Sequence, residues 1–60
     1  MSEKDIQTVS AMNKYGGSFV KALAEACWHA DLVNLQKIKN TWPEYWAEYT
    51  AMAEKDPDIL

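Results

Sequence analysis

Cys27 and His29 lie two positions apart and are the residues of this sequence best suited to metal binding or nucleophilic chemistry. A structural zinc site needs about four ligands, so this pair would have to recruit carboxylates. Residues two apart on a helix also point in different directions. We therefore expect no metal site, with Cys27 a small core residue and His29 at a helix end, where a cation is mildly favoured.

Acid–base chemistry would need a pair of carboxylates, and Glu44 and Glu48 stand one helical turn apart. A chain of 60 residues offers little cleft in which to desolvate them. The Gly16-Gly17 pair lacks the further glycines and the Lys-Ser/Thr ending of a phosphate-binding loop. The sequence therefore predicts that the protein is not an enzyme and holds no cofactor.

Aromatic residues concentrate in one short stretch of the sequence. Four of them fall on one face of a predicted helix: Trp42, Tyr45, Trp46 and Tyr49. In so small a protein most such rings belong to the core. Tyr and Trp also dominate the binding hot spots of interfaces. We predict that part of this stripe is core and that part contacts a partner protein or a second copy of the chain.

Nucleic acid is disfavoured as a partner, because the net charge is −3 and the six basic residues are all lysines. Arginine is the main bidentate donor to phosphates and guanine edges. A helix-turn-helix regulator is still an alternative interpretation. Its recognition helix would span 32–40 or 43–55, and the second of these is acidic. The first offers polar side chains able to meet bases or phosphates: Asn34, Gln36, Lys37, Lys39 and Asn40.

The elements that would position these residues are helical. The paired glycines end one segment, and Ser18 is a plausible N-cap for a central helix over 19–30. Asp31 is expected to cap a helix over 32–40. Apolar residues at three-four spacing mark the buried face of the central helix: Phe19, Val20, Leu23, Ala26, Cys27 and Ala30.

The last helix carries the clearest local signature. Thr41 and Glu44 have the spacing of a capping box, and Pro43 suits a first helical turn. The residue before Pro57 disfavours helix, so this helix is expected over 43–55.

Residues 2–13 have fewer anchors, although Ser2 and Asp5 resemble a capping arrangement. Their only large apolar residues are Ile6, Val9 and Met12, which predicts a short helix or a disordered arm.

These segments together predict an all-α fold, a compact bundle of three short helices with a weakly structured N-terminal arm or helix. The expected organisation is an arm over 1–14, a helical domain over 15–56 and a tail over 57–60. The single cysteine allows no internal disulfide and fits a reducing compartment. With no signal peptide or membrane-length apolar run, we expect a cytoplasmic protein without membrane contact. Because so short a chain buries little surface, we also expect a homodimer.

Three sequence patterns mark the helix boundaries within residues 13–52. They are the Tyr15-Gly16-Gly17-Ser18-Phe19 stretch before an alanine-rich helix, the His29-Ala30-Asp31 break, and the Trp42-Pro43-Glu44 start of the final helix. In these patterns the chain resembles a family of short phage and prophage proteins. The resemblance implies a phage-encoded protein in the bacterial host cytoplasm and transfers no catalytic residue. We predict a phage accessory protein that acts stoichiometrically by binding a host or phage protein, with counter-defence as one such role. The alternatives are the DNA-binding regulator and a self-assembling structural component.

Overall fold

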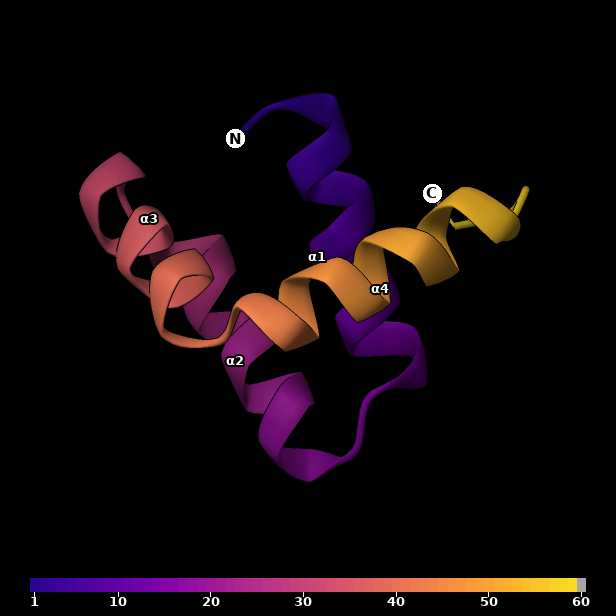
Figure 1. Cartoon of the computed structure of the whole chain (residues 1–60), viewed down its shortest axis with the longest axis horizontal. Coiled ribbons are helices and arrows are strands. Elements are labelled where there is room, and N and C mark those ends of the chain that lie inside the picture. Colours follow the sequence, from indigo (N-terminus) through magenta and orange to yellow (C-terminus); the bar gives the residue numbers. More distant parts are fainter. Residues whose placement is uncertain (60) are drawn as a thin grey trace.

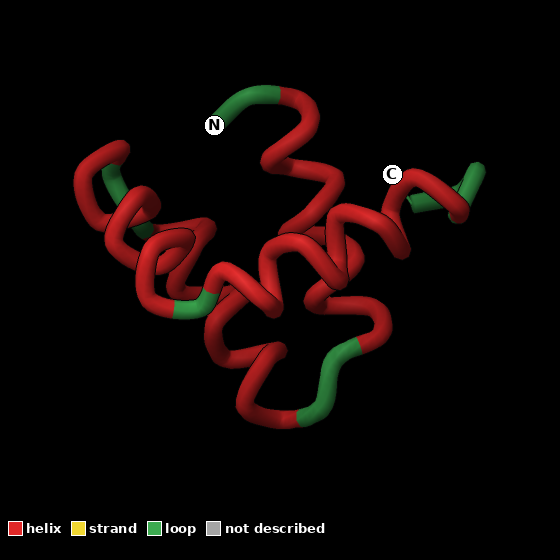
Figure 2. The backbone as a smooth tube through the Cα atoms, in the orientation of Figure 1, coloured by secondary structure: helices red, strands yellow, loops and turns green. Residues whose placement is uncertain are grey.

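The computed structural model describes residues 1–59 of the chain. This part contains four helices and no strand (Figure 1). They are α1 (Glu3–Tyr15), α2 (Ser18–His29), α3 (Leu32–Thr41) and α4 (Pro43–Lys55). The connections between them are only one or two residues long (Figure 2). The prediction of an all-α fold is confirmed, whereas the predicted number of helices is too low by one. Leu60, part of the predicted tail, lies outside the described residues.

The N-terminal segment is the fourth helix. The backbone N–H of Asp5 donates to the Ser2 hydroxyl at 3.1 Å, which confirms the cap predicted from these two residues. Four residues of α1 are buried: Thr8, Val9, Ala11 and Met12. Because Thr8 and Ala11 also belong to this buried face, the count of large apolar residues alone underestimates how firmly the helix is anchored.

α1 holds the bundle together, because it packs along both α2 and α4, whereas α3 contacts each of those helices over a shorter length. In Figure 1, α4 crosses in front of α1. At the crossing the Thr8 and Thr50 hydroxyls lie 2.8 Å apart. The Thr8 hydroxyl also donates to the carbonyl of Lys4 at 3.1 Å, so the Thr50 hydroxyl supplies the proton between the two threonines. The buried side-chain oxygen atoms at this crossing therefore have hydrogen-bond partners.

The turn between α1 and α2 depends on Gly16. A Cβ atom added there would lie 2.5 Å from the carbonyl oxygen of Met12 and 2.6 Å from a methyl group of Val20, so only glycine fits. Gly17 has open space around its Cα and is the N-cap of α2, without a side-chain hydrogen bond. The prediction that Ser18 is the N-cap is therefore wrong by one residue, since Ser18 already lies inside the helix.

Most of the remaining helix ends lie at the positions predicted from the sequence. The Asp31 carboxylate accepts from the backbone N–H of Asn34 at 2.8 Å, which confirms it as the N-cap of α3. Pro43 begins α4, which ends at Lys55, as predicted. The capping box is wrong, because Thr41 ends α3 and its hydroxyl donates to the Lys37 carbonyl at 2.7 Å. Because only Trp42 separates the two helices, Thr41 belongs to α3 and does not cap α4.

The C-terminal end of α4 is tied to the end of α1. The carboxylate of Asp56 accepts hydrogen bonds of 2.6 Å from the ammonium of Lys14 and from the hydroxyl of Tyr15. Its other oxygen accepts from the backbone N–H of Asp58 at 2.9 Å. These three donors lower the pKa of Asp56 to about 2.

Candidate functional site

The four residues of the predicted aromatic stripe do not share one environment. Tyr49 is 6% exposed and belongs to the core, and burial raises the pKa of its hydroxyl. Trp42, Tyr45 and Trp46 are partly buried and pack against the edge of that core. The structure therefore does not bring the four residues to one surface.

Trp42 and Tyr45 meet Phe19 at the surface. The ring of Phe19 packs edge-on against Trp42, with ring centroids 5.8 Å apart, and is tilted against Tyr45 at 6.1 Å. Phe19 is 53% exposed. We call these three residues the aromatic cluster. The sequence predicted that Phe19 lies on the buried face of the central helix, but in the first turn of α2 its side chain is exposed.

Trp46 lies elsewhere, beneath a charged pair. The ammonium of Lys39 lies 5.0 Å from the centroid of the Trp46 ring and 2.9 and 3.0 Å from the two carboxylate oxygens of Asp5. This arrangement joins α1, α3 and α4 through one partly buried ion pair. No local sequence pattern predicts this ion pair, because its partners are 34 positions apart and only the folded chain brings them together.

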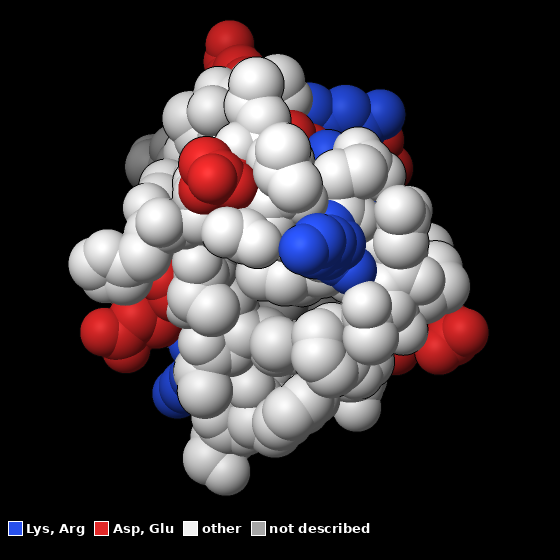
Figure 3. Space-filling model, turned by 90° about the vertical axis from the view of Figure 1, so that its left-hand side faces the viewer, with Lys and Arg blue, Asp and Glu red and all other residues white. Residues whose placement is uncertain are grey.

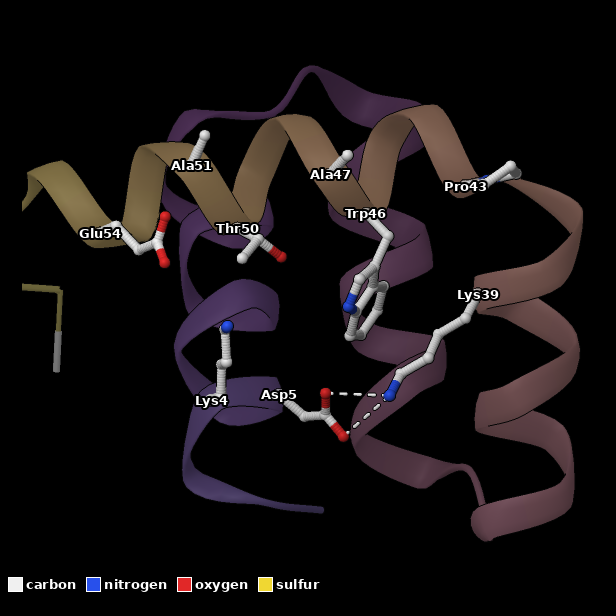
Figure 4. A pocket seen from close by; sticks show the side chains of 9 residues that line it. All are labelled: Lys4, Asp5, Lys39, Pro43, Trp46, Ala47, Thr50, Ala51 and Glu54. Carbon is white, nitrogen blue, oxygen red and sulfur yellow. Dashed lines mark hydrogen bonds and ion pairs between the residues drawn. The ribbon is translucent and has the colours of Figure 1, made fainter.

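The same residues form one end of an open groove of about 600 Å³ (Figure 4). Its walls come from α1, α3 and α4. Nine residues line it: Lys4, Asp5, Lys39, Pro43, Trp46, Ala47, Thr50, Ala51 and Glu54. No local motif in the sequence indicates this groove.

Cys27 is fully buried, as predicted, and burial raises the pKa of its thiol. His29 is exposed at the last position of α2. Across residues 1–59, no three His, Cys, Asp or Glu side chains are grouped so that they could hold a metal ion. Glu44 and Glu48 are both exposed and line none of the pockets described for this chain.

Three of the five side chains expected to contact DNA from α3 have partners within the folded chain. Lys39 is held by Asp5, and the Gln36 side chain donates to that of Asn40 at 3.0 Å. Of the five candidate contacts, Asn34 and Lys37 are left. Figure 3 shows the side of the molecule on which α3 lies. Most of this surface is uncharged, and one basic group lies near its centre. The basic stripe expected of a DNA-binding face is not seen there.

A second exposed apolar surface surrounds the turn between α2 and α3. Leu32 is 76% exposed and Val33 65% exposed, and Trp28 precedes them at the end of α2 with about half of its surface in contact with solvent. We call these three residues the α2–α3 corner.

Within the described chain, every helix is too short or too polar to cross a membrane. Comparisons with protein-family models, with curated proteins and with solved structures find no match to this chain.

Proposed function

We propose that this chain acts stoichiometrically by binding another protein rather than by catalysing a reaction. The observation that carries the proposal is the aromatic cluster, in which Phe19 is 53% exposed although its ring contacts those of Trp42 and Tyr45. Tyr and Trp are the side chains most enriched in the energetic centres of interfaces. Because these rings already support one another, a partner would immobilise them at little entropic cost.

The partner-binding role predicted for the four aromatic residues is thus proposed for two of them here, Trp42 and Tyr45, with Phe19 added. Tyr49 would act only indirectly, since it is 6% exposed and supports α4 from the core. Trp46 lies in the groove, where it would face a different ligand.

The setting that we propose is a bacterial cytoplasm in which a phage-encoded accessory protein binds a host or phage protein, and counter-defence is one role of this kind. The support is the resemblance of residues 13–52 to short phage and prophage proteins.

Quantitative affinity capture from a bacterial host tests the proposal. The tagged wild-type chain should retain one protein in a fixed molar ratio, and the purified pair should bind in isolation. Phe19→Ala should weaken that binding by about 30-fold or more, because truncating a hot-spot residue costs about 2 kcal/mol or more. Met52→Ala truncates an exposed hydrophobic side chain of α4 outside the aromatic cluster and serves as the control.

Two results would contradict the proposal. One is a partner that binds Phe19→Ala and the wild type equally well, provided that both proteins show the same helical circular dichroism. The other is a catalytic turnover that accounts for the biological effect without lasting association. A salt-sensitive, sequence-specific complex with DNA would instead support the regulator alternative.

A further inference from the structure

The groove between α1, α3 and α4 is separate from the aromatic cluster, because Phe19, Trp42 and Tyr45 do not line it. It follows one face of α4, where its lining residues recur at three- and four-residue intervals. From Pro43 to Glu54 this face extends about 16 Å at about 1.5 Å per residue, or three helical turns. The groove therefore has the length of a short helical segment.

One edge of the α4 wall carries small side chains, next to the row formed by Trp46, Thr50 and Glu54. Pro43, Ala47 and Ala51 are spaced four residues apart, and all three are exposed. Alanine at such positions lets another backbone approach closely, because no long side chain stands between them. Another part of the groove is lined by Trp46, Lys39 and Asp5 (Figure 4). The charges of Lys39 and Asp5 already neutralise each other in their ion pair.

Two further charges face the groove without an ion-pair partner in the described chain. Lys4 projects from α1 and Glu54 from α4, so the two lie on opposite walls near one end (Figure 4). An occupant that placed an acidic side chain toward Lys4 and a basic one toward Glu54 would be electrostatically complementary to both walls.

The backbone chemistry of the walls selects the type of occupant. All nine lining residues belong to helices, so their backbone hydrogen bonds are largely used within those helices. An extended peptide in the groove would lose water from its own N–H and C=O groups without gaining partners. A helix carries its backbone hydrogen bonds with it. A small molecule would leave much of its surface in water, because the groove is open along its length.

We propose that this groove binds an amphipathic α-helix of a partner protein. Small residues of that helix would pack against Ala47 and Ala51, an acidic side chain on one edge would meet Lys4, and a basic side chain on the other would meet Glu54. The proposal goes beyond the aromatic cluster by adding a second surface and the chemical class of the segment that occupies it.

Selection from a displayed library of helical peptides of about 15 residues or more, long enough to be helical in isolation, tests this proposal. Peptides selected on the wild-type chain should carry small residues along one stripe, with an acid and a base on its opposite edges. Selection on the double variant Lys4→Glu/Glu54→Lys should return the reversed charge pattern. Each selected peptide should bind the mismatched protein about tenfold more weakly, because both of its charge contacts become repulsive.

A blocking variant and a folding control complete the experiment. Ala47→Trp should fill the groove and weaken binding of the selected helices by tenfold or more while leaving the helical circular dichroism unchanged. Binding should also shift the indole N–H resonance of Trp46, which lies in the groove. Phe19→Ala should bind these helices as the wild type does, so failure of the aromatic-cluster proposal and failure of this one are distinguishable.

The proposal would be overturned if the library yielded no helix that competes at the groove, or if both proteins selected the same peptides. It would equally be overturned if the Trp46 resonance moved with protein concentration alone, because the occupant would then be a second copy of this chain.

Discussion

The Lys14 ammonium lies 2.6 Å from the Asp56 carboxylate, joining residues 42 positions apart in the sequence. Tyr15 donates to the same oxygen. Only 10% of the Asp56 side chain is exposed. We call Lys14, Tyr15 and Asp56 the latch, because their hydrogen bonds connect the end of α1 to the end of α4. The hydrogen bond to Asp56 raises the pKa of both Lys14 and Tyr15.

This latch predicts a loss of stability in acid. The pKa of Asp56 is lowered to about 2, below its ordinary value, so the folded state favours the ionised carboxylate. Its stabilising contribution is complete above about pH 5, where the unfolded chain is also ionised, and is lost as the pH falls toward 2. Asp56→Asn should flatten the decline in unfolding midpoint over this range, as measured by thermal circular dichroism. Glu25→Gln, which removes a carboxylate without an ion pair in residues 1–59, should leave the decline unchanged. An equally steep decline in Asp56→Asn would show that the latch contributes nothing.

The two glycines of the first turn should respond oppositely to the same substitution. Gly16→Ala places a methyl group against the Met12 carbonyl and Val20, and should destabilise the fold by about 1–3 kcal/mol. Gly17→Ala meets open space and should change stability by less than about 0.5 kcal/mol. Urea denaturation of both variants measures the difference. Equal effects would mean that Gly16 is not held in the close contact described.

The hydroxyl pair at the helix crossing should show energetic coupling. Thr8→Val deprives Thr50 of its acceptor and should cost about 1–2 kcal/mol, since a buried polar partner is lost. Thr50→Val should cost less, because Thr8 keeps its bond to the Lys4 carbonyl. The double variant should then cost less than the sum of the single variants. A double-mutant cycle measured by denaturation would contradict the pairing if the two effects simply added.

Cys27 should react slowly with thiol reagents. It is fully buried, and burial raises the pKa of its thiol, so both access and thiolate formation are restricted. Labelling with a chromogenic disulfide should proceed at the rate of local opening and accelerate sharply in denaturant. Labelling of the folded protein as fast as that of the unfolded chain would contradict the burial.

Self-association is proposed through surface that the monomer leaves uncovered. Val20 of α2 and Tyr49 of α4 are already buried in the core, whereas the α2–α3 corner holds the two most exposed large hydrophobic residues, Leu32 and Val33. Sedimentation equilibrium should give a dimer that the variant Leu32→Lys/Val33→Lys dissociates. The melting temperature of the wild type should rise with concentration. A monomeric mass at high concentration, with a constant melting temperature, would exclude the dimer.

The sequence predicts the helix boundaries well where they depend on local chemistry. Asp31 caps α3 and Pro43 begins α4, because both effects act within one turn. The sequence pattern underestimates the N-terminal helix, since its buried face includes Thr8, whose hydroxyl pairs with that of Thr50 in α4, and the small Ala11. The groove and the ion pair between Asp5 and Lys39 have no local signal at all. They arise from the relative placement of three helices, which periodicity along one segment does not encode.

The pairing of the first helix with the last has a kinetic consequence. In most small helical bundles, neighbouring helices can dock in sequence, which keeps the chain loops that must close short and the folding fast. Here the contact between α1 and α4 forms only after the intervening chain has brought its two ends together. The rate-limiting event in folding should therefore be this long-range closure, and the molecule should fold more slowly than its helical content alone implies.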